Sequence, residues 1–297
     1  MQLATQSVRS TEFQRNENGV VKATPGTASV EKSRVPSTQP AAQSVVRRNF
    51  SATRLSNLNR VSSPSEIAFI RRLTLFDDVS PENFYAILSR ACKKHLRRHE
   101  RVFLVGDPIE RVVLLLSGCV KMTQQGLRGN RAILRLTGAG EVVGTVTLTP
   151  GFKYGSTAQA VQPCTALVWD AAIFGKLLDS CAIFRRNMLR ALEECLQKME
   201  DRYRIVSTEK VASRLSRELI RSSKYFARVD GHPAIHLSRS ELAQLTGATL
   251  WSVSRLLCRW QEEGILSIGR ETVEILDLPA LERSTSEDLE LSQDSRS

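Results

Sequence analysis

Residues 237–255 read Leu-Ser-Arg-Ser-Glu-Leu-Ala-Gln-Leu-Thr-Gly-Ala-Thr-Leu-Trp-Ser-Val-Ser-Arg and carry the start signals of two helices. Ser238 and Glu241 have the spacing of a capping box, in which each side chain accepts a hydrogen bond from a free N–H group at the helix start. Gly247 stands where a tight turn between helices needs a positive φ angle. Thr249, a capping residue type, begins the next helix. The spacing predicts a helix-turn-helix unit over residues 237–263.

The second of these helices has two distinct faces. Its apolar stripe consists of Val253, Leu256, Leu257 and Trp260. The opposite face carries Leu250, Trp251, Ser252, Ser254, Arg255 and Arg259. In DNA-binding helix-turn-helix units the second helix enters the major groove through its N-terminal half. We therefore expect this face to read DNA.

The side chains on that face suit different contacts. Thr249 and Ser252 can donate hydrogen bonds to phosphates or bases, and Arg255 is long enough for a bidentate contact to guanine. Leu250 and Trp251 are unusual at such positions. Either one of them meets a thymine methyl group, or Trp251 packs on the domain core. For Trp251 we favour packing or apolar contact over hydrogen-bonded readout.

A β-hairpin is predicted directly after the two helices, at residues 264–277. Two short apolar runs flank Gly269-Arg270, which has the composition of a turn. Arg270 at the tip can reach a phosphate. A helix-turn-helix followed at once by such a wing is far more specific than two amphipathic helices alone. Residues 207–283 therefore predict a winged helix-turn-helix domain that binds double-stranded DNA.

The net charge of +11 does not by itself identify this domain, because residues 207–283 hold eleven basic and ten acidic side chains. Local clustering is more informative. A basic stripe follows one face of the helix that opens the domain, at Lys210, Arg214, Arg217, Arg221 and Lys224. This stripe is either a solvated face or a surface that follows the DNA backbone.

One long helix is predicted over residues 182–206. Its apolar residues recur at spacings of three and four, as in a heptad seam, and are Leu189, Leu192, Leu196, Met199, Tyr203 and Val206. Such a seam pairs with a second copy of the helix or packs on its own domain. Because it lies between two domain-like regions, we favour a parallel dimer helix and hence a homodimer.

Residues 63–181 predict helices followed by an all-β unit. Ser80-Pro81-Glu82 is a helix start, and from His95 to Phe174 short apolar runs alternate with glycine turns, which is typical of an antiparallel barrel or sandwich. The polar tail 1–62 and the acidic tail 284–297 have too few clustered apolar residues to fold, so we expect both to be disordered.

Composition restricts the location and the chemistry of the protein. No apolar run reaches the roughly 18 residues of a membrane span, and the N-terminus lacks a signal-like apolar core, so we expect a cytoplasmic protein without membrane contact. Six scattered cysteines contain no C-x-x-C pair, which argues against zinc and disulfides. No Walker loop, paired carboxylates or nucleophile–base signature is present. We expect no catalytic residue, no metal site and no enzyme.

Over residues 66–283 the chain resembles the Crp/Fnr family of transcription regulators. The motifs that carry the resemblance are the helix-turn-helix, Leu75-Phe76-Asp-Asp-Val-Ser80, Gly106-Asp107-Pro108, Leu115-Leu-Ser-Gly-Cys-Val-Lys121 and Leu134-Arg-Leu-Thr-Gly-Ala-Gly-Glu-Val-Val-Gly144. The resemblance implies an α+β fold made of a cyclic-nucleotide-binding-like β-roll (a jelly roll), a central dimerisation helix and a winged helix-turn-helix. It also implies a homodimer on a two-fold symmetric operator, contact with RNA polymerase and an effector in the roll.

The resemblance assigns roles to particular residues of the DNA-binding unit. Ser238, Arg239 and Ser240 match the residues that anchor the first helix to phosphates. The recognition positions are matched by Thr249, Leu250, Trp251, Ser252 and Arg255. Leu250-Trp251 replaces the Arg-Glu pair that is frequent in the family, so a different half-site sequence is expected.

The effector segments depart further from the family pattern. Members that bind cyclic nucleotides carry Gly-Glu-Leu, whose Glu contacts the ribose, and then Arg-Ser, whose Arg neutralises the phosphate. Here these segments read Gly144-Thr145-Val146 and Tyr154-Gly155-Ser156, with only Lys153 nearby. A buried phosphate without a guanidinium would be poorly compensated. We expect these residues to line a degenerate pocket that does not bind cyclic AMP; the effector is unknown.

Other sensing chemistries have less support in the sequence. An iron–sulfur cluster of the Fnr type needs cysteines ahead of the roll, and none precedes Cys92. His95 and His99 lie among lysines and arginines, which favours a solvated basic surface, with haem ligation as the alternative. Redox sensing by Cys119 or Cys164 is left open. A ligand-binding module whose helix-turn-helix no longer binds DNA is the second functional hypothesis.

Overall fold

The computed structural model describes residues 11–15, 21–25, 63–126, 129–144 and 151–284. The chain divides into two units, Met1–Asn49 and Phe50–Ser297. In the first unit, strands β1 (Thr11–Arg15) and β2 (Val21–Pro25) pair antiparallel. This pair lies in the segment 1–62, for which the composition predicts disorder. Overall composition does not indicate a single local hairpin. The other residues of that tail, and residues 285–297, lie outside the described part.

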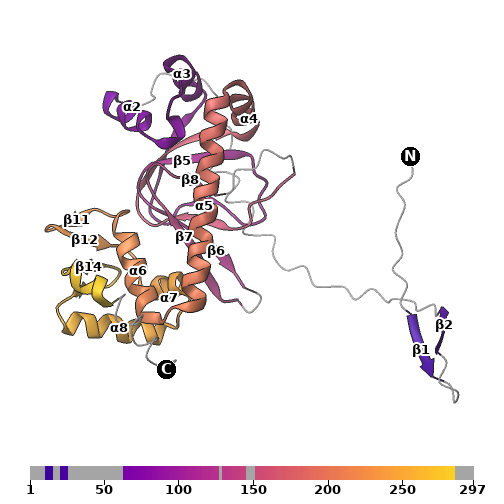
Figure 1. Cartoon of the computed structure of the whole chain (residues 1–297). Helices are drawn as coiled ribbons and strands as arrows, with labels where there is room; N and C mark the ends of the chain where they lie inside the picture. Colours follow the sequence, from indigo (N-terminus) through magenta and orange to yellow (C-terminus); the bar gives the residue numbers. More distant parts are fainter. Residues whose placement is uncertain (1–10, 16–20, 26–62, 127–128, 145–150, 285–297) are drawn as a thin grey trace. The chain divides into compact units, whose positions relative to one another are not determined.

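The second unit opens with three helical segments: α2 (Pro64–Arg71), η1 (Thr74–Phe76) and α3 (Pro81–Ser89). Ser80 caps α3 through Asn83 N–H, with Pro81 in the first turn, as the sequence predicts. The aromatic rings of Phe76 and Phe84 pack edge to face with centroids 5.2 Å apart. These helices cover one end of the roll (Figure 1).

The roll consists of two four-stranded antiparallel sheets, ordered β3-β10-β5-β8 and β4-β9-β6-β7. Its strands are β3 (Cys92–Leu96), β4 (Arg101–Phe103), β5 (Arg111–Ser117), β6 (Val120–Gln125), β7 (Arg131–Thr137), β8 (Val142–Val143), β9 (Thr157–Ala160) and β10 (Cys164–Asp170). Both sheets contribute to one buried apolar cluster, for example Leu115 and Ala166 from the first and Val120 and Ala158 from the second. The sheets therefore face each other, as expected for a two-sheet β unit.

Two helices follow, α4 (Ala171–Ser180) and α5 (Ala182–Thr208). At 27 residues, α5 is about 40 Å long and runs the length of the second unit (Figure 1). Its first turns are anchored in the core, where Phe184 stacks on Phe76 and the amide of Asn187 donates to the carbonyl oxygen of Asp77 at 2.7 Å. The rest of α5 extends toward the C-terminal domain.

The C-terminal domain contains α6 (Val211–Ser223), β11 (Arg228–Val229), β12 (His232–Ile235), α7 (Arg239–Thr246), α8 (Leu250–Glu262), β13 (Leu266–Ile268) and β14 (Val273–Ile275). The predicted wing is present as β13 and β14, and β12 extends it by pairing with β14. Trp260 and Leu257 of α8 are fully buried beneath this sheet and α6.

The C-terminal domain packs against the roll. Its apolar core continues into Cys119, Ile133, Leu136 and Val161 of the roll. Lys121 Nζ of β6 forms an ion pair with Glu241 Oε1 of α7 at 2.5 Å. Among the described residues, no helix is both long and apolar enough to cross a membrane.

Candidate DNA-binding surface and ligand pockets

The turn between α7 and α8 is built from the predicted capping residues. The backbone N–H of Glu241 donates to Ser238 Oγ at 3.2 Å, and that of Ser238 donates to Glu241 Oε2 at 2.9 Å. Gly247 ends α7 with φ 64°. The N–H of Ser252 donates to Thr249 Oγ1 at 3.1 Å, which starts α8. Local hydrogen bonds therefore fix the angle between the two helices.

Alpha-helix α8 presents the face that the sequence assigns to DNA. Val253, Leu257 and Trp260 are fully buried, whereas the opposite face is open to solvent. Eight of the eleven predicted DNA-contact residues are exposed: Arg239, Ser240, Thr249, Leu250, Trp251, Arg255, Arg259 and Arg270. The other three, Ser238, Ser252 and Ser254, are half-buried. The structure thus brings the predicted residues together on α7, α8 and the wing.

Trp251 does not pack on the domain core, which removes one of the two interpretations offered by the sequence. Its side chain is 68% exposed. The guanidinium carbon of Arg255, one turn later, lies 5.3 Å from the centroid of its ring. The core position belongs instead to Trp260, because only that residue lies on the buried stripe. Trp251 is left as an exposed apolar group beside the best candidate for base readout.

Two basic residues of this surface have acidic neighbours. Arg259 Nε lies 3.4 Å from Glu263 Oε1. At the tip of the wing, next to Arg270, Glu271 pairs with Arg98 of the roll at 2.7 Å. No local sequence signal indicates this role of Arg98, because 172 residues lie between the two partners.

Most side chains of the basic stripe on α6 form contacts within the protein. Arg214 donates to the carbonyl oxygen of Val206 at 3.2 Å, and Arg217 pairs with Glu209 at 2.9 Å. Arg221 lies 3.7 Å from Glu218. These contacts favour neither a freely solvated face nor a DNA-backbone surface. Arg214 and Arg217 attach α6 to its surroundings, and Arg221 pairs within the helix.

Aromatic rings fill the interior of the roll where the effector segments meet. Phe103 and Tyr154 stack with centroids 3.6 Å apart, and the hydroxyl of Tyr154 donates to the carbonyl oxygen of Arg111 at 2.8 Å. Burial raises the pKa of Tyr154 to about 12, so its hydroxyl stays protonated. A Cβ atom at Gly144 would meet Phe103 at 2.6 Å. The rings leave little room beside Gly144.

The two predicted effector segments are only partly brought together. Gly144 lies against Phe103 and Tyr154, whereas Gly155 is exposed and Ser156 half-buried. Thr145 and Val146 lie outside the described residues. The sequence also suggested that no arginine stands nearby, but Arg135 on β7 donates to the carbonyl oxygen of Gly144 at 3.4 Å. Only strand pairing brings that side chain close.

The alternative sensing residues occupy different environments. His95 and His99 are exposed, and His95 Nδ1 lies 3.2 Å from Thr165 Oγ1. Burial raises the pKa of Cys164 to about 11 and that of Cys119 further still. Both thiols therefore remain protonated near neutral pH, and protonated thiols are poor nucleophiles. Redox sensing by this pair has no support from its chemistry.

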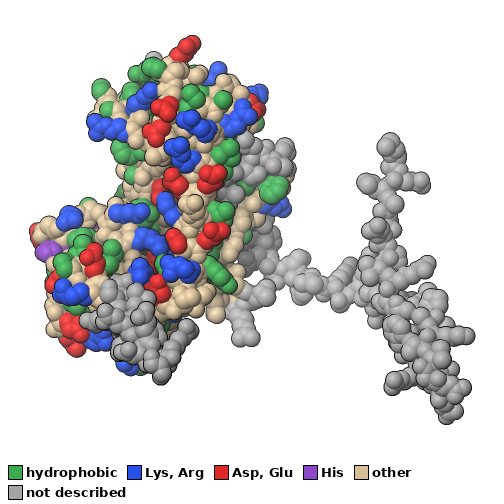
Figure 2. Space-filling model, viewed as in Figure 1, with side chains coloured by type: hydrophobic (Ala, Val, Ile, Leu, Met, Phe, Trp, Pro, Cys, Tyr) green, Lys and Arg blue, Asp and Glu red, His purple; other side chains and the backbone are tan. Residues whose placement is uncertain are grey.

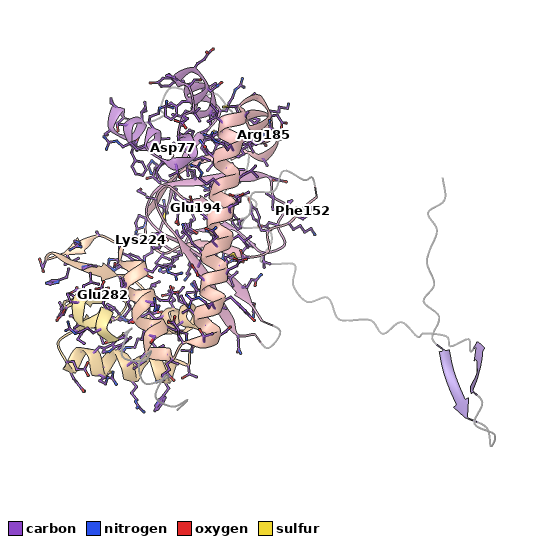
Figure 3. All side chains as sticks on the ribbon, viewed as in Figure 1. Asp77, Phe152, Arg185, Glu194, Lys224 and Glu282 are labelled. Carbon is purple, nitrogen blue, oxygen red and sulfur yellow. The ribbon has the colours of Figure 1, made fainter. Side chains whose placement is uncertain are left out.

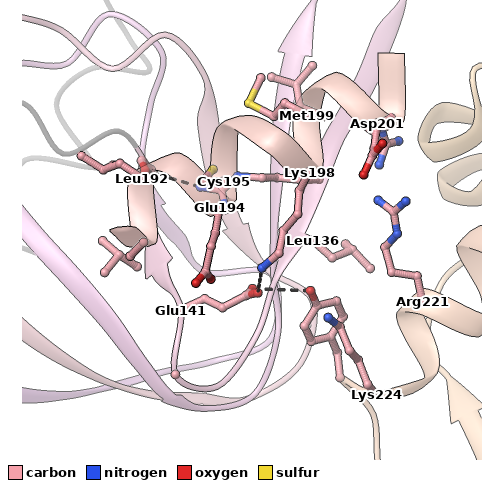
Figure 4. Close-up of a pocket in the computed structure, with 18 of the residues that line it drawn as sticks. Leu136, Glu141, Leu192, Glu194, Cys195, Lys198, Met199, Asp201, Arg221 and Lys224 are labelled. Atoms are coloured by element: carbon pink, nitrogen blue, oxygen red, sulfur yellow. Dashed lines mark hydrogen bonds and ion pairs between the residues drawn. The ribbon is translucent and has the colours of Figure 1, made fainter. Parts of the chain in front are cut away.

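A second pocket lies between β7, the connection to β8, helix α5 and the end of α6. Its volume is about 320 Å³. Glu194 on α5 and Lys224 after α6 both line it (Figure 3). Inside it, Glu141 accepts from Lys198 Nζ at 3.5 Å and from the hydroxyl of Tyr225 at 3.4 Å (Figure 4). No local sequence signal indicates this pocket, since its walls are distant in sequence.

The predicted seam of α5 is mostly exposed on a single chain. Five of its six residues are open to solvent: Leu189, Leu196, Met199, Tyr203 and Val206. Tyr203 is 78% exposed. Leu192 differs, because it is half-buried against the apolar cluster of the roll's own end. On this face, hydrophobic side chains are interspersed with charged ones (Figure 2).

Two family models match the chain: the cyclic nucleotide-binding domain over residues 93–181 and the Crp-like helix-turn-helix domain over residues 209–284. The chain is 26% identical over 208 residues to the cyclic AMP receptor protein of Thermus thermophilus, which covers 70% of this chain and 94% of that protein. It is 23% identical over 192 residues to the fumarate and nitrate reduction regulatory protein of Escherichia coli, covering 64% and 76%.

Solved structures share the fold. A CRP/FNR-family transcriptional regulator of Thermus thermophilus superposes with a TM-score of 0.58 at 19% identity, covering 66% of this chain and 100% of that chain. The c-di-GMP-responsive global regulator of Xanthomonas campestris gives a TM-score of 0.55 at 21% identity, covering 66% and 99%.

Proposed function

Because this chain belongs to the Crp/Fnr family of transcriptional regulators, we propose that it binds a two-fold symmetric operator as a homodimer and responds to an effector other than cyclic AMP. The family consists of regulators and not of enzymes. Membership also supports RNA polymerase as a further partner and the cytoplasm as the place of action.

The observation that carries the DNA-binding role is the divided surface of α8. Val253, Leu257 and Trp260 of its apolar stripe are fully buried, and its opposite face exposes Trp251, Arg255 and Arg259 beside the wing residue Arg270. Arg255 stands in the N-terminal half of the helix, the part that faces base edges in helix-turn-helix complexes. Arginine is the side chain that most often contacts guanine. We assign base readout to Arg255 and phosphate contacts to Ser238, Arg239, Ser240, Thr249 and Arg270.

The remaining exposed positions of α8 complete this surface. Leu250 and Trp251 suit apolar contacts, such as those with thymine methyl groups, and Ser252 and Ser254 supply short hydroxyls beside them. Because Leu250-Trp251 stands where the family often has Arg-Glu, the half-site should differ from that of relatives. Arg259 is partly engaged by Glu263, so we assign it a minor phosphate contact.

The homodimer is supported by the exposed seam of α5. Isolated exposed leucines need no explanation, but a line of apolar residues at heptad spacing on one helix is typical of a coiled-coil face. Two copies would bury Leu189, Leu196, Met199, Tyr203 and Val206 against each other. The pairing would place the two α8 helices on one operator.

The proposal against cyclic AMP is supported by the interior of the roll. The Thermus thermophilus relative is named a cyclic AMP receptor protein. In this chain, the stacked rings of Phe103 and Tyr154 occupy the space beside Gly144, and the segment Tyr154-Gly155-Ser156 holds no arginine where nucleotide-binding members carry Arg-Ser. A cyclic phosphate would find no guanidinium in this segment.

Enrichment from a random pool of double-stranded DNA tests the proposed function. Purified full-length protein should select a palindrome whose half-sites are separated by about one helical turn, 10–10.5 base pairs. Failure to enrich any sequence would overturn the DNA-binding role and favour a ligand-binding module. Calorimetric titration with cyclic AMP should show no binding to the roll; a saturable signal from the wild-type protein would contradict the effector proposal.

A further inference from the structure

The pocket between β7, α5 and α6 joins the sensor-like roll to the DNA-binding domain. Its walls come from η1 (Thr74 and Leu75), from the roll (Leu134 to Leu136, Gly140 to Val142 and Gly144), from α5 and from α6 with the two residues after it. Its volume of about 320 Å³ is near the lower end of small-molecule sites, which span about 300–1,000 Å³. Neither Phe103 nor Tyr154 lines it. The stacked rings that fill the roll leave this pocket open.

One wall of the pocket is apolar. The lining includes Leu134 and Leu136 of β7, Val142 of β8, and Leu192 and Met199 of α5. Met199 also belongs to the exposed seam, so in the proposed dimer the partner helix would border this side. A wall of this kind suits the apolar body of a ligand, since burying such a body removes it from water.

The α6 side of the pocket has an excess of positive charge. Arg202 and Arg221 share one carboxylate, that of Glu218, at 3.3 and 3.7 Å. Lys224 lies over the ring of Tyr225, with its ammonium 4.8 Å from the centroid. The other carboxylates of the lining are those of Glu141, which accepts from Lys198 and from the hydroxyl of Tyr225, and those of Glu194 and Asp201 on α5. An anionic group would therefore be better compensated near α6 than a cationic one.

An unused hydroxyl lies on the same side. Ser222 lines the pocket and is 1% exposed, and its Oγ has no hydrogen-bond partner among the described residues. Buried polar groups in folded proteins are nearly always hydrogen-bonded, and each exception needs a reason. Because this Oγ is itself closed off from solvent, a ligand oxygen would supply the missing partner after a small shift of the α6 wall.

We propose that this pocket binds a small amphipathic carboxylate, with its apolar body along Leu134, Leu136 and Leu192 and its carboxylate at Arg221, Ser222 and Lys224. The carboxylate competes with Glu218 for Arg221 and so releases part of the charge that Glu218 shares with Arg202. Arg202 also donates to the carbonyl oxygen of Leu245 at the end of α7. A bound ligand would therefore change side-chain contacts of both α6 and α7. An effect of the ligand on DNA affinity would follow only if the function proposed above is correct, whereas ligand binding itself does not depend on that function.

The first experiment measures ligand binding without DNA. Octanoate and octan-1-ol share an apolar chain and differ in the head group, so each is titrated into the full-length protein by calorimetry. Octanoate should bind at least about tenfold more tightly, and Arg221→Gln should remove most of that difference while leaving octan-1-ol unchanged. Lys176→Gln is the matched control, because the Lys176 side chain is exposed on α4 and lies outside the pocket. Equal binding of both compounds, or none, would overturn the proposal.

A second variant separates ligand binding from folding. Ser222→Ala removes a hydroxyl that has no partner, so the ligand-free protein should melt at the same temperature or higher. Octanoate binding should nevertheless weaken several-fold. If Ser222 has only a structural role, the melting temperature falls and octanoate binding is unchanged, which would contradict the assignment. Ala191→Trp, which fills the pocket from α5, should abolish octanoate binding.

The regulatory part of the proposal has its own readout. Once an operator has been selected, octanoate should change the affinity of the wild-type protein for it by at least about threefold and leave Ala191→Trp unaffected. Octanoate binding without any change in operator affinity would overturn the coupling through α6. Failure to select any operator would instead count against the proposed function, and the calorimetric result would still stand.

Discussion

Trp251 and Arg255 occupy successive turns on the exposed face of α8, and their separation matches an i, i+4 pair. A guanidinium above an exposed aromatic ring gains about 0.5–1 kcal/mol. Arg255 is therefore held by its neighbour before any DNA arrives. A long side chain that is already ordered loses less conformational entropy when it binds.

Replacing Arg255 tests the assignment of base readout. Arg255→Ala should reduce discrimination by about 1–3 kcal/mol at one base step in each half-site, because a bidentate contact to guanine is lost. Fluorescence anisotropy with operators that vary at single positions measures this change. A uniform loss of affinity for all sequences would identify Arg255 as a phosphate contact instead.

Trp251 provides a related prediction. Trp251→Ala should weaken discrimination at the same base step as Arg255→Ala, whereas Trp251→Phe, which keeps an aromatic face, should retain most of it. The double variant Trp251→Ala/Arg255→Ala should lose no more at that step than Arg255→Ala alone. Additive losses would mean that the ring contacts the DNA independently of the guanidinium.

At the scale of elements, the two halves of α5 differ in burial. Phe184 and Asn187 anchor its first turns in the core, while Leu196 and Tyr203 stand exposed further along. The structure also separates Leu192 from the other seam residues, because it packs partly against the end of the roll. A charge at Leu192 would therefore disturb the fold as well as any dimer.

Leu196 is the better position at which to test the seam. Leu196→Asp should convert a wild-type dimer into a folded monomer, because a carboxylate would be buried in the helix pair without a partner. Sedimentation at micromolar concentration measures the mass, and circular dichroism checks the fold. Arg190→Asp, off the seam on the same helix, should leave the dimer intact. A monomeric wild-type protein at this concentration would contradict the seam's role.

At the scale of the whole molecule, Glu241 links local capping to the docking of the C-terminal domain. Its carboxylate accepts from the backbone N–H of Ser238 in the capping box and pairs with Lys121 of the roll. Burial acts to raise the pKa of Glu241, but the hydrogen bonds from Lys121 and Ser238 outweigh burial and lower it below the ordinary value. The ionised carboxylate therefore stabilises both α7 and its contact with β6.

The lowered pKa predicts an acid-dependent loss of stability. A carboxyl group whose pKa is lower in the folded than in the unfolded state stabilises the fold at pH values above its unfolded-state pKa. This stabilisation is lost as the pH falls through the folded-state pKa. Glu241→Gln should lower the free energy of unfolding by about 1–3 kcal/mol at pH 7, and the difference from wild type should shrink below about pH 4.5. Urea unfolding across this range measures it. Glu282→Gln, at an exposed position, should show neither effect.

Much of the DNA-binding surface could be predicted because its signals are local. The capping box at Ser238 and Glu241, the left-handed Gly247 and the cap at Thr249 all act within four residues. Helical periodicity then assigns Val253 and Trp260 to the core. Periodicity could not settle whether Trp251 packs inward, because a residue at the start of a helix lies near the boundary between its two faces.

The sequence alone determined the order of the elements and the two faces of α8, and it predicted that the arginine of nucleotide-binding relatives is missing. These depend on residue type, helical spacing and motif. Only the tertiary structure decided that Phe103 stacks on Tyr154, that Arg135 reaches Gly144 and that Arg98 holds the wing through Glu271. It also decided where a pocket remains. Such features require strand pairing and domain docking between distant segments, and the free energy of those contacts depends on three-dimensional packing that no local pattern encodes.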